Sequence, residues 1–172
     1  MNIRLSKGFK TAYQVVMVRH GESIWNLENR FTGWQNIGLS EQGVKESLEA
    51  GRRLREQGFK FDLTFTSTLK RAICCYNLIA EEMNIHHIPV LKSYRLNERH
   101  YGALEGLNKS ETAAKHGEEQ VKIWRRSFDI PPPMLDATDK RAPMNQEMYN
   151  HLPRNALPLS EVKSAIETEN SL

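Results

Sequence analysis

Short apolar runs alternate with longer amphipathic stretches along the first ninety residues. The segment Tyr13–Val18 is a nearly continuous apolar run rich in β-branched side chains, which predicts a buried parallel strand. Residues 61–66 alternate with period two and predict a second strand. Residues 87–91 predict a third strand, which Pro89 restricts to the edge of a sheet because proline donates no ladder hydrogen bond.

Two amphipathic stretches lie between these strands. The first begins after Ser40, a good N-cap residue, and ends near Gly58, which suits the turn after a helix. The second follows Ser67 or Thr68, either of which is able to cap it, and repeats apolar residues at helical spacing. The alternation of strand and helix predicts an α/β fold with a mostly parallel sheet and right-handed crossovers.

The second half of the chain has weaker patterns. Residues 111–116 and 118–128 look helical, and the prolines at 131–133 end that pattern. Beyond these prolines we expect little contribution to a core. Residues 160–169 are expected to form one exposed helix with few apolar residues to anchor it. The predicted organisation is a catalytic domain at 1–133, followed by a poorly ordered or weakly helical segment at 134–172.

Composition narrows the class of protein. The 172 residues suit one domain, and 39% hydrophobic with 26% charged residues is typical of a globular chain. A net charge of +3 is too small to indicate nucleic acid, although residues 1–128 hold 20 Lys and Arg against 14 Asp and Glu. The adjacent Cys74 and Cys75 fit neither a disulfide framework nor a metal motif, and His86-His87 lacks further ligands at zinc spacing. With no apparent signal peptide or membrane span, we expect a cytoplasmic protein that binds neither metal, membrane nor nucleic acid.

The main candidate for chemistry is His20. It follows the predicted strand that ends at Val18, where α/β folds bind ligands. Gly21 permits close approach of the backbone, and Arg19 offers a guanidinium for phosphate oxygens. A neutral imidazole is a competent nucleophile toward phosphorus. These residues alone are also compatible with an ordinary surface histidine.

The residues around and beyond His20 resemble the cofactor-dependent, 2,3-bisphosphoglycerate-dependent phosphoglycerate mutases of the histidine phosphatase superfamily. The resemblance keeps order and spacing from about Tyr13 to Pro133. It is carried by RHGES at 19–23, WN at 25–26, NRFTGW at 29–34, TS at 66–67, KRA at 70–72, RLNERHYGALEG at 95–106, LNK at 107–109 and WRR at 124–126. It implies a three-layer α/β/α sandwich.

The resemblance also implies roles for individual residues. His20 matches the phosphorylated nucleophile, and Arg19 and Arg71 match the guanidiniums that hold the transferring group. Glu98 matches the acid and base that serves the substrate hydroxyl. The other positions match substrate-binding residues: Ser23, Asn26, Thr32, Gly33, Tyr101, Lys109, Arg125 and Arg126.

The implied activity is the interconversion of 3-phosphoglycerate and 2-phosphoglycerate in glycolysis and gluconeogenesis. The implied partners are small phosphorylated three-carbon acids, with 2,3-bisphosphoglycerate as the cofactor that primes the enzyme, and a homo-oligomer is compatible with the family. Phosphoryl transfer depends mainly on positioning and positive charge, which this set of residues supplies.

The resemblance fades beyond Pro133. The family continues with a core strand that ends in His-Gly-Asn-Ser, and these 172 residues contain no such segment. The comparison therefore implies a C-terminally truncated chain that lacks one core strand and a second active-site histidine. Loss of one charge-stabilising donor typically costs about 10²–10³ in rate.

Two alternatives stay open. A bisphosphoglycerate mutase or phosphatase uses the same chemistry, although its hallmark in the family is Gly where this chain has Ser23. A catalytically impaired fragment that binds anions or pairs with an intact subunit is the other, and the missing second histidine favours it.

Overall fold

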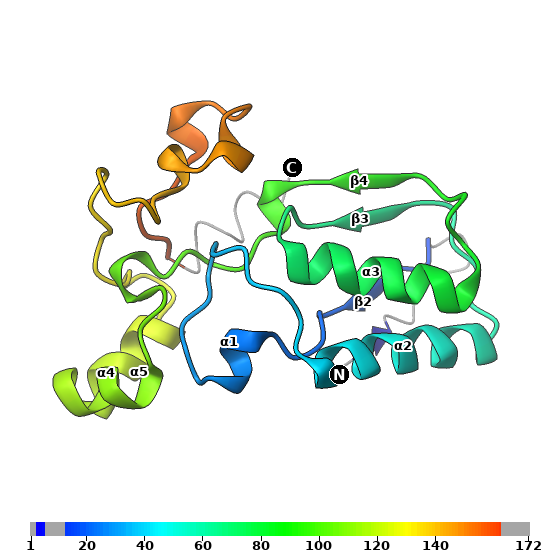
Figure 1. Ribbon diagram of the computed structural model, residues 1–172, viewed down its shortest axis with the longest axis horizontal. Helices are drawn as coiled ribbons and strands as arrows, with labels where there is room; N and C mark the ends of the chain where they lie inside the picture. Colours follow the sequence, from blue (N-terminus) through cyan, green and yellow to red (C-terminus); the bar gives the residue numbers. More distant parts are fainter. Residues whose placement is uncertain (1–2, 6–12, 163–172) are drawn as a thin grey trace.

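The computed structural model describes residues 3–5 and 13–162. Two pairs of short strands and two long helices form one part of the molecule, and two shorter helices lie at a distance from them (Figure 1). The strands and α-helices are β1 (Ile3–Leu5), β2 (Val16–Val18), α1 (Ile24–Leu27), α2 (Glu41–Glu56), β3 (Thr64–Thr66), α3 (Lys70–Met83), β4 (Val90–Lys92), α4 (Lys109–His116) and α5 (Glu118–Arg126).

Strands β3 and β4 pair in parallel, with Thr64 opposite Val90 and Thr66 opposite Lys92. A parallel pair needs a crossover connection, and α3 supplies it between the two strands. The predicted mixed α/β fold with a parallel sheet is therefore confirmed. Both strands are shorter than the sequence pattern predicts.

The expectation for Tyr13–Val18 is partly wrong. Strand β2 pairs antiparallel with β1, with Ile3 opposite Val18. The strand is not buried on both faces: Val16 and Val18 pack against the core, whereas Met17 is 68% exposed. Alternate side chains of a strand point to opposite faces, so a nearly continuous apolar run does not by itself show that both faces are covered.

Helices α2 and α3 lie side by side and carry the main core (Figure 1). Ser40 caps α2 as predicted, since its hydroxyl accepts a hydrogen bond from the Gly43 amide over 3.1 Å. The buried residues Ala50, Leu54, Cys75 and Ile79 join the two helices. This contact excludes water from apolar side chains and fixes α3 against α2.

The predicted cap of α3 is wrong. Leu69 occupies the N-cap position and makes no side-chain cap. The Ser67 hydroxyl accepts from the Leu69 amide before the helix starts, and Thr68 donates to the Asn97 side chain instead. The helix still begins one residue before Arg71, which places that side chain in its first turn.

The segment after Pro133 contributes more core than the sequence predicts. Within 134–162, Tyr149 is fully buried and packs against Trp34 with ring centroids 5.1 Å apart, and Leu157 joins the same cluster. Its regular structure is confined to short 3₁₀ turns, so no periodic pattern announces the packing. Residues 160–162 are not helical, and the remainder of the predicted helix at 160–169 lies outside the described residues.

Candidate active site

His20 lies two residues after β2, and its ring nitrogens have distinct partners. Nδ1 is 2.6 Å from the Gly21 carbonyl oxygen, which only accepts, so Nδ1 carries the proton. Nε2 therefore holds the lone pair, and it accepts from Nε of Arg71 over 3.1 Å. Burial lowers the pKa of His20 to about 4 against the opposing effect of the Gly21 bond, and the charges of Arg71 and Arg19 lower it further. The imidazole is thus neutral near pH 7, as a nucleophile must be.

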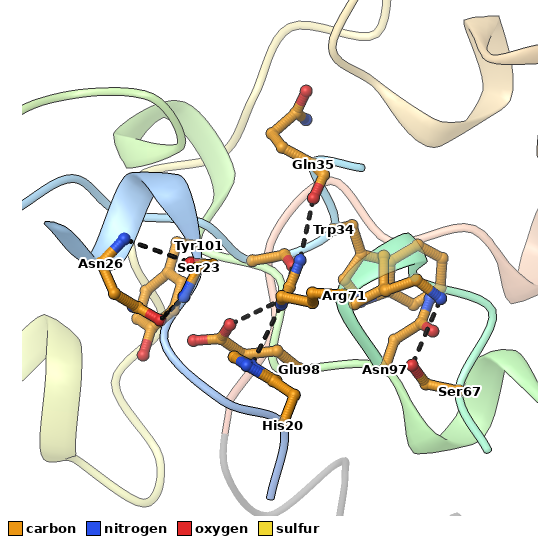
Figure 2. Close-up of polar contacts among 12 residues, drawn as sticks. His20, Ser23, Asn26, Trp34, Gln35, Ser67, Arg71, Asn97, Glu98 and Tyr101 are labelled. Carbon is orange, nitrogen blue, oxygen red and sulfur yellow. Dashed lines mark hydrogen bonds and ion pairs between the residues drawn. The ribbon is translucent and has the colours of Figure 1, made fainter. Parts of the chain in front are cut away.

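Arg71 is the centre of the hydrogen-bond network (Figure 2). Its side chain is 1% exposed, and its guanidinium donates to the carbonyls of Gln35 and Gly33 over 3.0 and 2.8 Å. The same group donates to Glu98 over 3.0 Å, besides its bond to His20. Burial lowers the pKa of Arg71, an effect that Glu98 opposes. The two carbonyls fix the plane of the guanidinium and aim its remaining donors at the two reactive side chains.

Glu98 reaches Arg71 from the segment that follows β4. Its side chain is 36% exposed, whereas the arginine that it contacts is buried. His20 and Glu98 therefore touch one guanidinium through different nitrogens and converge on one region (Figure 2). The arrangement places a lone pair, a fixed positive charge and a carboxylate together, as group transfer between oxygen and nitrogen requires.

The loop that follows His20 is built by local bonds. Ser23 and Asn26 cap α1 reciprocally, each side chain accepting from the other's backbone amide over 3.1 Å. Gly33 adopts a φ of +53°, and its carbonyl faces Arg71. Thr32 is buried, and its hydroxyl has no hydrogen-bond partner among the described residues. A substrate-binding role for these four residues stays a prediction.

A second, basic group of predicted residues lines a cleft of about 610 Å³ beside α4 and α5. Lys109, Arg125 and Arg126 face it. Its other charged lining residues are Lys122, Glu118 and Glu119. Burial lowers the pKa of Lys109, and the charges of Arg125 and Arg19 lower it further while Glu98 raises it. Arg19 and Glu98, which belong to the His20 region, therefore lie close enough for their charges to act on Lys109 in the cleft.

The remaining predicted residues flank these groups. Arg19 is exposed beside His20. Tyr101 packs on Phe31 with ring centroids 5.4 Å apart, and the guanidinium of Arg99 lies 5.1 Å from its ring. Burial raises the pKa of Tyr101. The tyrosine thus contacts both Phe31 and the buried Arg99.

Sequence reasoning missed three residues that support the site. Arg99 donates to the carbonyls of Trp124 and Ser127 over 2.8 and 3.4 Å, and so holds the end of α5. Gln35 offers Arg71 a carbonyl, and the buried Glu105 contacts the same turn. Arg99 and Glu105 lie inside the 95–106 motif, but their roles depend on backbone partners that no sequence pattern reveals.

Within residues 3–5 and 13–162, no three His, Cys, Asp or Glu side chains gather closely enough to hold a metal ion. None of the helices in these ranges combines the length and the apolar character needed to cross a bilayer.

Solved structures resemble this fold. A mycobacterial glucosyl-3-phosphoglycerate phosphatase, solved as a complex with VO3, is 26% identical, with a TM-score of 0.57 over 66% of this chain and 51% of its own. YhfR of Bacillus stearothermophilus is 25% identical, with a TM-score of 0.54 over 82% of this chain and 56% of its own. A phosphoglycerate mutase from Bacillus anthracis shares the fold at 24% identity and a TM-score of 0.52, over 63% of this chain and 49% of its own. The chain therefore spans about half the length of these proteins.

The sequence itself matches a family model over most of its length. The model is that of the histidine phosphatase superfamily, branch 1, and it matches residues 15–146. This range contains His20, Arg71 and Glu98 as well as the basic cleft. On this match, the chain belongs to the histidine phosphatase superfamily.

Proposed function

We propose that this protein transfers phosphoryl groups through a phosphohistidine formed at His20. The observation that carries the proposal is the contact of His20 and Glu98 with one buried guanidinium, that of Arg71. A neutral Nε2 beside a fixed positive charge suits attack on phosphorus. The same charge stabilises the oxygens of the transferring group.

The first half-reaction forms a bond between Nε2 and phosphorus and breaks the bond between phosphorus and the donor oxygen. Glu98 in its protonated form gives a proton to the departing oxygen. In the second half-reaction the Glu98 carboxylate takes a proton from an acceptor hydroxyl, whose oxygen attacks the phosphorus. The nitrogen–phosphorus bond breaks, and the electron pair returns to Nε2.

We propose further that the substrates are 3-phosphoglycerate and 2-phosphoglycerate, with 2,3-bisphosphoglycerate as the priming donor. The cleft is lined by more cations, Lys109, Lys122, Arg125 and Arg126, than carboxylates, Glu118 and Glu119. This excess of positive charge supports an anionic substrate with a second negative group besides the transferring phosphoryl. The charges of Arg19 and Arg125 both act on Lys109, so a carboxylate or second phosphate there would relieve mutual repulsion. The basic residues fit such a ligand.

A phosphatase activity is the second candidate. The 26% identical mycobacterial protein is a phosphatase that acts on a phosphoglycerate derivative, as its name states. In this chain Glu98 is 36% exposed, so water is able to reach the carboxylate that would activate it. Release of inorganic phosphate, measured beside mutase turnover, separates the two activities.

The test begins with ³²P-labelled 2,3-bisphosphoglycerate. We expect the chain to acquire label that is lost in acid and stable in base, as a phosphohistidine is, and to convert 3-phosphoglycerate to 2-phosphoglycerate. His20→Ala should acquire none of this label, whereas His86→Ala, at an exposed turn position three residues after α3, should label like the wild type. Label that persists in His20→Ala would refute the assignment. Label without turnover of 3-phosphoglycerate would support phosphoryl transfer and refute the proposed mutase activity.

A further inference from the structure

Glu105 is a buried carboxyl group that the reaction as described does not use. Its side chain is fully buried, and its oxygens accept three hydrogen bonds. Oε1 accepts from the backbone amides of Trp34 and Tyr101 over 2.9 and 3.1 Å, and Oε2 accepts from the Gln35 side chain over 2.7 Å. Two of the three donors belong to the 33–35 turn, which therefore depends on Glu105 for its shape.

The same turn also binds the guanidinium of Arg71. The carbonyls of Gly33 and Gln35 accept from its two terminal nitrogens. A chain of direct contacts thus runs from Glu105 through the turn to the guanidinium that touches His20 and Glu98. A side chain at position 33 would collide with the Glu105 carboxyl, so this close approach requires the glycine.

We propose that Glu105 is a positioning residue for phosphoryl transfer: when ionised it holds the 33–35 turn so that the turn aims Arg71 at His20, and protonation of Glu105 loosens that hold. The proposal rests on the proposed function of His20. It assigns Glu105 no contact with substrate.

The chemistry of the three donors explains why the charge matters. An ionised carboxylate accepts from all of them, whereas a protonated one presents an O–H to one donor. Gln35 is poorly placed to adapt, because its amide nitrogen also donates to the Arg141 carbonyl over 3.2 Å. Turning the amide over would bring its oxygen against that carbonyl.

The surroundings place this change near neutral pH. Burial raises the pKa of Glu105 to about 7, against the three hydrogen bonds that lower it, and the charge of Glu98 raises it further. The Arg141 guanidinium donates to the Glu105 backbone carbonyl over 2.7 Å, and His100 Nδ1 lies 3.5 Å from Oε1. Burial lowers the pKa of His100 to about 4, so it adds no charge near pH 7. The charge of Glu105 in turn raises the pKa of Arg71 and of Tyr149, and Tyr149, whose pKa burial raises to about 12, is neutral near pH 7.

The test compares the wild type with Glu105→Gln in single-turnover phosphorylation of His20 by 2,3-bisphosphoglycerate, on both sides of pH 7. Glutamine keeps one oxygen for the two backbone amides but sets its own NH₂ against that of Gln35. Well above pH 7 we expect the wild type to be phosphorylated about tenfold faster than Glu105→Gln, because the variant loses one hydrogen bond to a charged group. Well below pH 7 the ratio of the two rates should approach one. A ratio that stays constant with pH, or equal rates throughout, would overturn the proposal.

Two variants sharpen the comparison. Glu56→Gln removes a charge from the exposed end of α2 and should match the wild type at every pH. Gln35→Ala should also slow phosphorylation well above pH 7, and its loss should not add to that of Glu105→Gln because both break one contact. Additive losses would show that the two residues act separately.

A second readout needs no turnover. The ¹⁵N signal of Arg71 Nε should report a held guanidinium above pH 7 and a looser one below it, and it should lose this dependence in Glu105→Gln. An unchanged signal across pH 7 in the wild type would overturn the proposal. A wild type that shows this signal but never acquires a phosphoryl group would leave Glu105 in its positioning role and refute the proposed function instead.

Discussion

Arg71 donates from Nε to Nε2 of His20 over 3.1 Å, at the atom where the imidazole carries its lone pair. The arginine is anchored by two backbone carbonyls and reaches Glu98 with the same guanidinium. A phosphoryl group that bonds to Nε2 would meet this donor at once. The geometry therefore gives Arg71 two tasks: it favours the neutral form of His20 before the reaction, and it stabilises charge on the phosphoryl oxygens during it.

Replacement of Arg71 by lysine should impair phosphorylation of His20 by about 10²-fold or more, because an ammonium group is a point donor and does not reproduce the fork. Arg71→Lys keeps the positive charge, so the loss would reflect geometry. Single-turnover labelling measures it, with Arg52→Lys on the exposed face of α2 as the matched control. A loss of less than about threefold would mean that charge alone suffices.

Glu98→Gln should separate the proton transfers from attack at His20. With acetyl phosphate as donor, the leaving acetate needs no proton, and we expect His20 to be phosphorylated at a rate within about threefold of the wild type. With phosphoglycerates the departing oxygen needs a proton, and turnover should fall by about 10²-fold or more. Equal loss with both donors would assign Glu98 to the binding or placement of Arg71.

Sequence patterns predicted the two long helices and the parallel strands β3 and β4, because helical periodicity and strand alternation are local properties. The grouping of Arg71 and Glu98 with His20 was implied by the family resemblance. The patterns did not predict the exposure of Met17 or the burial of Tyr149. Both depend on which distant segments cover a surface, and the segment that carries Tyr149 has no regular period. The role suggested for Glu105 was equally hidden, since its partners at the turn are backbone amides and an amide side chain.

His100 should make stability depend on pH. Its folded pKa of about 4 lies below the usual 6.5, so the unfolded chain binds the extra proton between these values. The stabilising effect of neutral His100 is complete above about pH 6.5 and is lost as pH falls through 4. We expect the advantage of the wild type over His100→Asn in the free energy of unfolding to shrink by about 2–3 kcal/mol over this range. Urea titrations at several pH values measure it, and a difference that does not vary with pH would contradict the assignment.

The exposed apolar side chains of the strands should limit solubility. Met17 is 68% and Phe65 59% exposed, and within the described residues β2 and β3 each pair with one neighbour only. Unpaired strand edges favour association, and exposed apolar side chains beside such an edge strengthen it by being buried in the contact. Phe65→Thr should lower light scattering at high protein concentration without lowering the melting temperature. Unchanged scattering would show that this strand does not drive association.

The central claim is that Nε2 of His20 accepts the phosphoryl group. Two-dimensional ¹H–³¹P correlation spectroscopy of the chain, after incubation with 2,3-bisphosphoglycerate, tests it most directly, because the coupling pattern distinguishes phosphorus on Nε2 from phosphorus on Nδ1. The structure predicts a single phosphohistidine with phosphorus on Nε2, since Nδ1 donates its proton to Gly21. Phosphorus on Nδ1, or on any residue other than His20, would contradict the account.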